Sequence, residues 1–310
     1  MGRRYQHLSI NRDNTEYLNG VTVATLFSQE RVMIRNAILV VLYNKGLESS
    51  ATLQTLIQHP FKHVKLTIHN NGPFRISEED AFFLRLKTIY EQVELVNCLE
   101  NKPLSQVYNQ FIMSNLQVER WVILDDDTTI NESFWFAVEH TQADIECPRI
   151  ISSINYKTYY PVSQGEIVLN YQELDPATAF SIGSGLIIHR RLWDVFERYG
   201  LSLFDENYAL YGVDVSVFRR IHRLSACGET FLLKSSCYLE HALSRSEKKE
   251  SEFRITENLI DLAVSARRYP QFHLYYHLGW RLFKQFIRLR FKTVLVAIQA
   301  FFRGKHPRCS

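Results

Sequence analysis

The sequence predicts an α/β protein in which a mostly parallel sheet is flanked by helices and followed by an amphipathic helical tail. Continuous apolar runs of strand length alternate with helical patterns between residues 37 and 127, which is the order of right-handed βαβ units. With 310 residues, 46% of them hydrophobic, the chain is long enough to bury a large core. After residue 261 the pattern changes to helical segments rich in aromatic and basic residues.

The first half contains predicted strands and helices in strict alternation. The stretch "AILVVLYN" is apolar until its last residues, as expected for a strand buried on both faces. Ser77, which precedes acidic residues, and Pro103 are residue types that favour the start of a helix. The strands are predicted at 37–44, 63–72, 93–98 and 120–127, and the helices at 47–58, 77–92 and 103–117.

The second half is less regular. A strand is predicted to run into a helix over 180–200, an amphipathic helix to end the segment 203–224, and a strand to lie within 229–243. No repeat or clear linker interrupts this part, so 36–260 is predicted to form one domain. Residues 1–35 are polar with little periodicity and are predicted to form a leader that is loosely attached or mobile.

The net charge of +3 conceals an uneven distribution. Residues 262–310 contain ten Lys or Arg and no Asp or Glu, whereas the rest of the chain holds 26 basic and 33 acidic residues. The five cysteines are scattered, without a spacing typical of zinc sites or disulfide scaffolds, and this favours a reducing compartment. The chain start has no apolar core like that of a signal peptide, and no apolar run is long enough for a spanning helix.

Three consecutive aspartates, Asp125, Asp126 and Asp127, follow the fourth predicted strand. Adjacent like charges disfavour ionisation, so such a cluster is usually accompanied by a cation or strong donors. Open parallel sheets bind ligands beyond the carboxyl ends of their strands. The aspartates should therefore share one crevice with residues that end two other strands, namely Tyr43, Asn44, Asn70 and Asn71.

The motif "LDDDT" (124–128) is compatible with two chemistries. A glycosyltransferase uses such carboxylates to hold a divalent cation at the diphosphate of a sugar nucleotide. A phosphatase of the haloacid dehalogenase type uses the first aspartate as a nucleophile, here Asp125, and the second, Asp127, for proton transfer. An Asp-rich structural turn is a third possibility. The phosphatase motif normally follows the first strand of its fold, whereas three predicted strands precede it here.

From about residue 37 to 243 the chain resembles family 2 glycosyltransferases of the GT-A fold, especially rhamnosyltransferase-like enzymes of bacterial surface polysaccharide synthesis. "HNNG" (69–72) is similar to the family's D-N-G turn, with Asn70 replacing aspartate, and "NKPLSQVYNQF" (101–111) keeps two asparagines at the family spacing. "LDDDT" matches the L-D-x-D-T motif. The longest match is "GSGLIIHRRLWDVFERYG" with "LFDENYALYGVDVSVFRR", where Ser216 replaces a usual glutamate.

The resemblance implies a GT-A type, Rossmann-like sheet and a role for each matching residue. The 36–130 half would bind a nucleoside-diphosphate sugar, and the 131–260 half would bind the acceptor. Mn²⁺ or Mg²⁺ would be held by Asp127 and His241, and Asp214 would be the general base of an inverting reaction. Donor contacts would come from Tyr43, Asn44, Asn70, Asn101, Asp125 and Asp126, and acceptor contacts from Gly183, Ser184 and Gly185. The departures at Asn70, Pro103 and Ser216 also allow a catalytically degenerate binding protein of this fold.

The basic tail (261–310) is predicted to associate with a membrane surface. On a continuous helical wheel, apolar residues including Leu278 and Phe283 lie opposite a polar face formed by Arg281, Lys284, Gln285, Arg288, Lys292, Gln299 and Arg303. Residues 271–305 are therefore expected to bind an anionic membrane surface rather than nucleic acid. This predicts a cytoplasmic enzyme at the inner face of the cell membrane, acting on a lipid-linked or polysaccharide acceptor.

Overall fold

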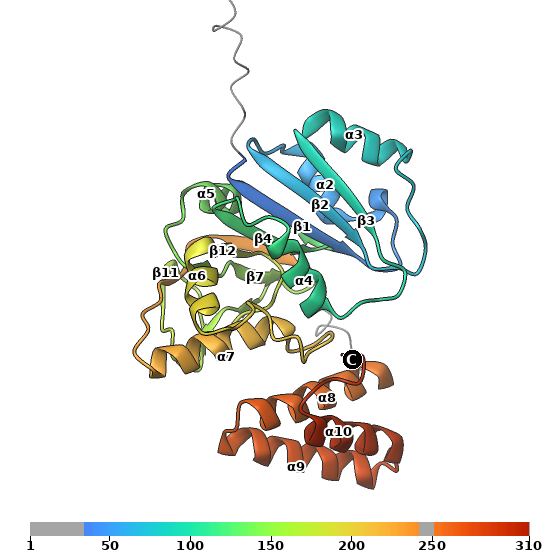
Figure 1. The fold of residues 1–310 in the computed structure, drawn as a ribbon, viewed down its shortest axis with the longest axis vertical. Helices are drawn as coiled ribbons and strands as arrows, with labels where there is room; N and C mark the ends of the chain where they lie inside the picture. The colour runs from blue at the N-terminus through green and yellow to red at the C-terminus, as the bar shows by residue number, and fades with distance from the viewer. Residues whose placement is uncertain (1–33, 242–250, 310) are drawn as a thin grey trace, which may run out of the picture. The chain divides into compact units, whose positions relative to one another are not determined.

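The computed structural model describes residues 34–241 and 251–309; most of the predicted leader, 1–33, lies outside this range. Six of the eight strands in the main sheet of the described residues run in one direction, and β12 and β11 run opposite to them (Figure 1). The predicted α/β fold class is confirmed. The sheet order is β11 (Gln172–Leu174), β13 (Leu233–Ser235), β6 (Ile145–Glu146), β12 (Leu186–His189), β4 (Arg120–Asp125), β1 (Asn36–Leu42), β2 (Val64–Asn70) and β3 (Gln92–Asn97).

Strands β1 and β4 form the centre of the sheet because both of their faces are apolar. Ile38 and Val40 of β1 belong to one core cluster, and Leu39 and Val41, which point to the opposite face, belong to another. The first cluster is completed by α2 (Ala51–Gln58), α3 (Ala81–Ile89) and α5 (Glu132–His140). The second is completed by α4 (Leu104–Met113), α6 (Arg190–Arg198) and α7 (Val213–Ala226).

A second, four-stranded sheet lies beside the end of β4. Its order is β5 (Thr128–Thr129), β14 (Tyr238–His241), β7 (Arg149–Ser152) and β8 (Thr158–Tyr160). Strand β5 follows the three aspartates directly, so this small sheet connects the aspartate loop to a strand from the other end of the domain. A short ribbon of β9 (Val162–Ser163) and β10 (Glu166–Ile167) precedes β11.

The C-terminal segment consists of α8 (Glu252–Arg268), α9 (Phe272–Ile287) and α10 (Phe291–Arg303). The predicted domain boundary after residue 260 falls inside α8. The predicted helical tail is present as separate helices, because the chain breaks between α9 and α10 at Leu289, which has a positive φ of 57°. Gln285, expected on the polar face, is instead buried with Leu278. Among the described residues, no helix is both long and apolar enough to span a bilayer.

Candidate functional site

The aspartate loop between β4 and β5 is fastened to the start of α2. The Thr52 hydroxyl donates to the Asp125 carbonyl at 2.5 Å and accepts the Thr128 backbone N–H at 3.0 Å. Ser50, the N-cap of α2, donates its hydroxyl to the Asp126 carbonyl at 2.9 Å. Buried hydrogen bonds of this kind fix a backbone, so the positions of the aspartate side chains are set by a helix far away in the sequence.

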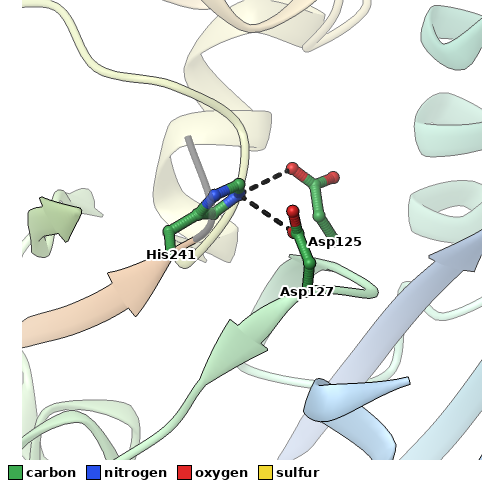
Figure 2. Close-up of side chains that lie close together, drawn as sticks. All are labelled: Asp125, Asp127 and His241. Carbon is green, nitrogen blue, oxygen red and sulfur yellow. Dashed lines mark hydrogen bonds and ion pairs between the residues drawn. The ribbon is translucent and has the colours of Figure 1, made fainter. Parts of the chain in front are cut away.

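His241 reaches the aspartates through strand pairing. It ends β14 and lies opposite Thr128 of β5 in an antiparallel register. Its Nε2 atom lies 3.3 Å from Asp125 Oδ2 and 3.4 Å from Asp127 Oδ1, and Figure 2 shows the three side chains converging. The sequence prediction placed Asp127 and His241 together as metal ligands; the structure places Asp125 with them.

These three side chains fit a divalent cation. One ligand atom from each lies within 4.8 Å of the others, and the set of two carboxylate oxygens and one imidazole nitrogen suits Mn²⁺. Burial raises the pKa of the Asp127 carboxyl above its ordinary value, an effect that His241 opposes and Asp125 reinforces. The three groups therefore form a partly desolvated anionic site, which a cation would neutralise.

A cavity of about 330 Å³ lies at the carboxyl ends of β1 and β2. Asn44, Lys45 and Asn70 line it, together with the exposed ring of Phe74. Lys45 also pairs with Asp126, with Nζ 2.9 Å from Oδ1. Burial raises the pKa of Asp126, and the hydrogen bond and charge of Lys45 oppose this rise. Lys45 therefore connects the cavity with the aspartate loop.

The predicted donor-binding residues do not all face this cavity. Asn70 is buried and uses its side chain to hold the following turn, donating to the Phe74 carbonyl at 2.6 Å and to Asn97 Oδ1 at 2.8 Å. Asn101 accepts a hydrogen bond from Asn71 at 3.3 Å, and neither it nor Tyr43 is among the residues lining the cavity. Asn70 thus shapes the wall, and the side chain of Tyr43 is exposed to solvent.

Asp214 lies in the first turn of α7 and is held by backbone donors. Its carboxylate accepts the N–H groups of Gly183 and Val215, each at 2.9 Å. Burial raises the pKa of Asp214 to about 6, and the charge of Asp125 contributes to the rise. Ser184, which follows Gly183, accepts the Asp125 backbone N–H at 3.1 Å. Adjacent residues therefore hold Asp214 and Asp125 on the same side of the domain.

The three members of the predicted acceptor triplet face different surroundings. Gly183 lies beside Asp214 and the Tyr108 hydroxyl. The Ser184 side chain is fully buried, with its hydroxyl 2.7 Å from that of Thr128. At Gly185, where φ is +86°, a Cβ atom would come within 2.3 Å of the Leu239 side chain. Ser184 and Gly185 therefore support the fold, and only Gly183 remains a candidate for acceptor contact.

Sequence reasoning missed several residues of this site. Lys45 follows Asn44 at the end of the first strand, and the rule that strand ends meet would have included it. Thr52 and Ser50 could not be recognised in the sequence, because their role depends on contacts with a distant loop.

Asp261 is a further acidic residue that the sequence analysis did not single out. It is the last acidic residue before the acid-free tail. Burial raises the pKa of its carboxyl to about 6, and the charge of Arg219 opposes this rise.

Comparison with known proteins gives weak similarities only. No protein-family model matches the sequence, and no curated protein matches it. Solved structures with a similar chain path include Staphylococcus aureus TarS (TM-score 0.48, 12% identity, 80% of this chain and 41% of TarS). Others are TarS 1–349 in complex with UDP-GlcNAc (0.49, 13%, 81% and 72%) and the mannosyltransferase PcManGT from Pyrobaculum calidifontis in complex with GDP-Man and Mn²⁺ (0.48, 12%, 93% and 83%). Similarities of this size do not assign the chain to a family.

Proposed function

We propose that this protein is a metal-dependent glycosyltransferase of the GT-A type. It would move a sugar from a nucleoside-diphosphate sugar to a hydroxyl group of a lipid-linked or polysaccharide acceptor. The convergence of Asp125, Asp127 and His241 carries the proposal, because these side chains come from distant segments and could together hold a cation. Lys45, which pairs with Asp126, lines the neighbouring cavity. The resemblance of the motifs to family 2 enzymes is consistent with it.

The cavity at the ends of β1 and β2 would hold the nucleoside of the donor. The exposed aromatic ring of Phe74 offers a surface on which a base can stack. Lys45 lies between this cavity and Asp126, where its ammonium group would contact the diphosphate. A cation held by Asp125, Asp127 and His241, Mn²⁺ or Mg²⁺, would neutralise the charge that develops on the departing diphosphate.

Asp214 would act as the general base. The acceptor hydroxyl loses its proton to the Asp214 carboxylate as its oxygen attacks the anomeric carbon, and the bond from that carbon to the diphosphate oxygen breaks. A carboxyl group with a pKa of about 6 is largely ionised at neutral pH yet more basic than an exposed aspartate. A single displacement of this kind would invert the configuration at the anomeric carbon.

Calorimetric titration tests the proposal directly. UDP and GDP, each with and without Mn²⁺, are titrated into the wild type, Asp127→Asn and a control, Asp194→Asn, whose exposed carboxylate lies on α6. We expect Mn²⁺-dependent binding of one nucleotide that Asp127→Asn loses and Asp194→Asn keeps. Absence of nucleotide binding in the wild type would refute the proposal.

Two further measurements, of aspartyl-phosphate formation and of donor turnover, distinguish the remaining alternatives. A phosphatase of the haloacid dehalogenase type would form an aspartyl-phosphate on Asp125, which mass spectrometry after trapping detects. A degenerate protein would bind the nucleotide and Mn²⁺ but would neither transfer the sugar nor hydrolyse the donor. The proposed enzyme binds the nucleotide with Mn²⁺ and releases nucleoside diphosphate from its donor. It forms no aspartyl-phosphate on Asp125.

We also propose that α9 and α10 contact an anionic membrane surface. Large apolar side chains are unusually exposed on these helices and their connection. The positive charge of this segment favours an anionic membrane as the binding surface, since residues 262–310 carry ten basic and no acidic side chains. The most exposed apolar residues are Phe272, Tyr276, Phe283, Phe286, Ile287, Leu289, Phe291, Leu295 and Phe302.

Vesicle sedimentation tests this second proposal. We expect the protein to sediment with vesicles that contain phosphatidylglycerol, less with pure phosphatidylcholine, and less in high salt. Replacing Phe283 and Phe302 by Asp should reduce sedimentation, whereas Phe136→Asp, at an exposed position on α5, should not. Equal sedimentation of all three proteins would contradict a role for α9 and α10.

A further inference from the structure

A second cavity, of about 710 Å³, lies between α7, the segment 177–180 and the start of α9. Its lining includes the side chains of Arg219 and Arg223 from α7, Arg268 from the end of α8, and His273 from α9. Among the described residues that line it, none is acidic. The cavity is therefore a basic pocket formed jointly by the sheet domain and the C-terminal helices.

Two of its arginines make no close ion pair with another described residue; Arg223 is exposed, and the charge of Arg219 also acts on the carboxyl of Asp261. Arg268 is already engaged, because its Nε–H donates to Asp205 at 2.9 Å. In contrast, within the described part of the chain neither Arg219 nor Arg223 lies within 4.0 Å of a carboxylate oxygen. The guanidinium of Arg219 stacks over the ring of Tyr269, 5.8 Å from its centroid, which holds the group at the cavity wall.

The spacing on α7 relates this cavity to the proposed general base. Val215, Arg219, His222 and Arg223 line one face of the helix, and Val215 directly follows Asp214. At a rise of about 1.5 Å per residue, Arg219 lies about 7.5 Å and Arg223 about 13 Å along the axis from Asp214. The cavity therefore begins one residue from Asp214, on the neighbouring face of α7.

We propose that this basic cavity binds a phosphate or diphosphate group of the acceptor. The proposal rests on the proposed glycosyltransferase function and names its acceptor class, a molecule that carries a phosphate group next to an apolar chain. Arginine is well suited to this role because its planar guanidinium contacts phosphate oxygens with two donors. The apolar part of the lining, Phe180 with Pro270, gives room for the carbon chain next to the phosphate.

Calorimetry without divalent cations, in the presence of a chelator, tests the proposal on the full chain. The probes are inorganic diphosphate and geranyl diphosphate. We expect both to bind the wild type and Arg223→Glu to weaken binding at least about tenfold. Arg85→Glu is the matched control, because Arg85 is an exposed helical arginine on α3 and, within the described residues, has no ion pair. It should bind like the wild type.

Two further measurements distinguish phosphate binding in this cavity from phosphate binding in the donor site and from binding of lipid headgroups. Lys45→Met tests the donor site as the source: if it abolishes diphosphate binding and Arg223→Glu does not, the probe occupies the donor site and the proposal fails. Vesicles containing phosphatidylglycerol report on lipid headgroups. If Arg223→Glu weakens only vesicle binding, the arginine contacts the membrane and the proposal fails. No binding of either diphosphate to the wild type also overturns it.

The outcome is independent of the test of the proposed function. Binding of UDP or GDP with Mn²⁺ is measured on the same preparations of wild type and Arg223→Glu. We expect it to be equal in both, because Arg223 does not line the donor cavity. If the wild type does not bind UDP or GDP with Mn²⁺, the proposed glycosyltransferase function is refuted. If the wild type and Arg223→Glu bind diphosphate equally, only the proposed acceptor cavity is refuted.

Discussion

His241 Nε2 lies 3.3 Å from Asp125 Oδ2, although 116 positions separate these residues in the chain. The contact exists because β14 pairs with β5 immediately after the aspartate loop. The small four-stranded sheet is therefore more than a support for the domain. Its register decides whether an imidazole nitrogen joins the two carboxylates, and the proposed cation site depends on that register.

Replacing Thr52 by Val should weaken Mn²⁺ binding without altering any proposed ligand. The Thr52 hydroxyl accepts the buried Thr128 N–H and donates to the Asp125 carbonyl, so its loss leaves buried polar groups unpaired. We expect a loss of about 1–3 kcal/mol in the free energy of unfolding and about tenfold weaker Mn²⁺ binding. Denaturant unfolding and Mn²⁺ titration measure the two effects.

Thr55→Val is the matched control for this prediction. Among the described residues, the Thr55 hydroxyl hydrogen-bonds to the Ala51 carbonyl within α2 and not to the aspartate loop. We expect its Mn²⁺ affinity to equal that of the wild type. Equal weakening by both variants would show that the helix as a whole, rather than the Thr52 contact, controls the site.

Replacing Gly185 by Ala should destabilise the fold near His241. A Cβ atom there would lie 2.3 Å from Leu239 Cδ1 and 2.7 Å from Pro148 Cγ, and the residue has a φ of +86°. We expect a loss of about 2–4 kcal/mol in the free energy of unfolding, from overpacking together with backbone strain. Gly165→Ala separates backbone strain from overpacking. Its φ is +83°, and among the described residues no atom other than those of its chain neighbours lies within 4 Å of the added Cβ. It should cost about 1 kcal/mol. Equal losses for both variants would contradict the steric argument.

The rate of sugar transfer should fall in acid as Asp214 becomes protonated. Burial raises the pKa of Asp214 to about 6, and a general base works only when ionised. We expect kcat/KM to be constant at neutral pH and to fall about tenfold per pH unit below pH 6. Asp214→Asn should abolish transfer while leaving nucleotide binding intact. A profile without an acid limb near pH 6 would argue against Asp214 as the base.

The first half of the fold was predictable because its strands are long and buried. Strands β1 to β4 lie within two or three residues of the predicted ranges, since runs such as 37–42 contain no polar residue that competes for another conformation. Strands such as β6 and β9 have two residues each, too few to show a period. The tail is helical as predicted, but a single helical wheel assumes a continuous axis, and the positive φ of Leu289 interrupts it.

Residues of the site were predictable where a motif or a strand end marks them. Asp125, Asp127, Asp214 and His241 were named in this way, and their roles stay predictions. The burial of Ser184 could not be predicted, because its hydroxyl bond to Thr128 depends on the strand order of the sheet. The role of Thr52 likewise depends on a contact with residues more than 70 positions away. No local pattern encodes such contacts.

Pulsed electron paramagnetic resonance of bound Mn²⁺ tests the central claim most directly. The account predicts a Mn²⁺ site with a directly coordinated histidine nitrogen in the presence of the nucleoside diphosphate that binds. His241→Gln should remove the nitrogen coupling, and Asp127→Asn should weaken Mn²⁺ binding at least about tenfold. A Mn²⁺ spectrum without histidine nitrogen, or one unchanged in His241→Gln, would contradict the Asp125–Asp127–His241 site.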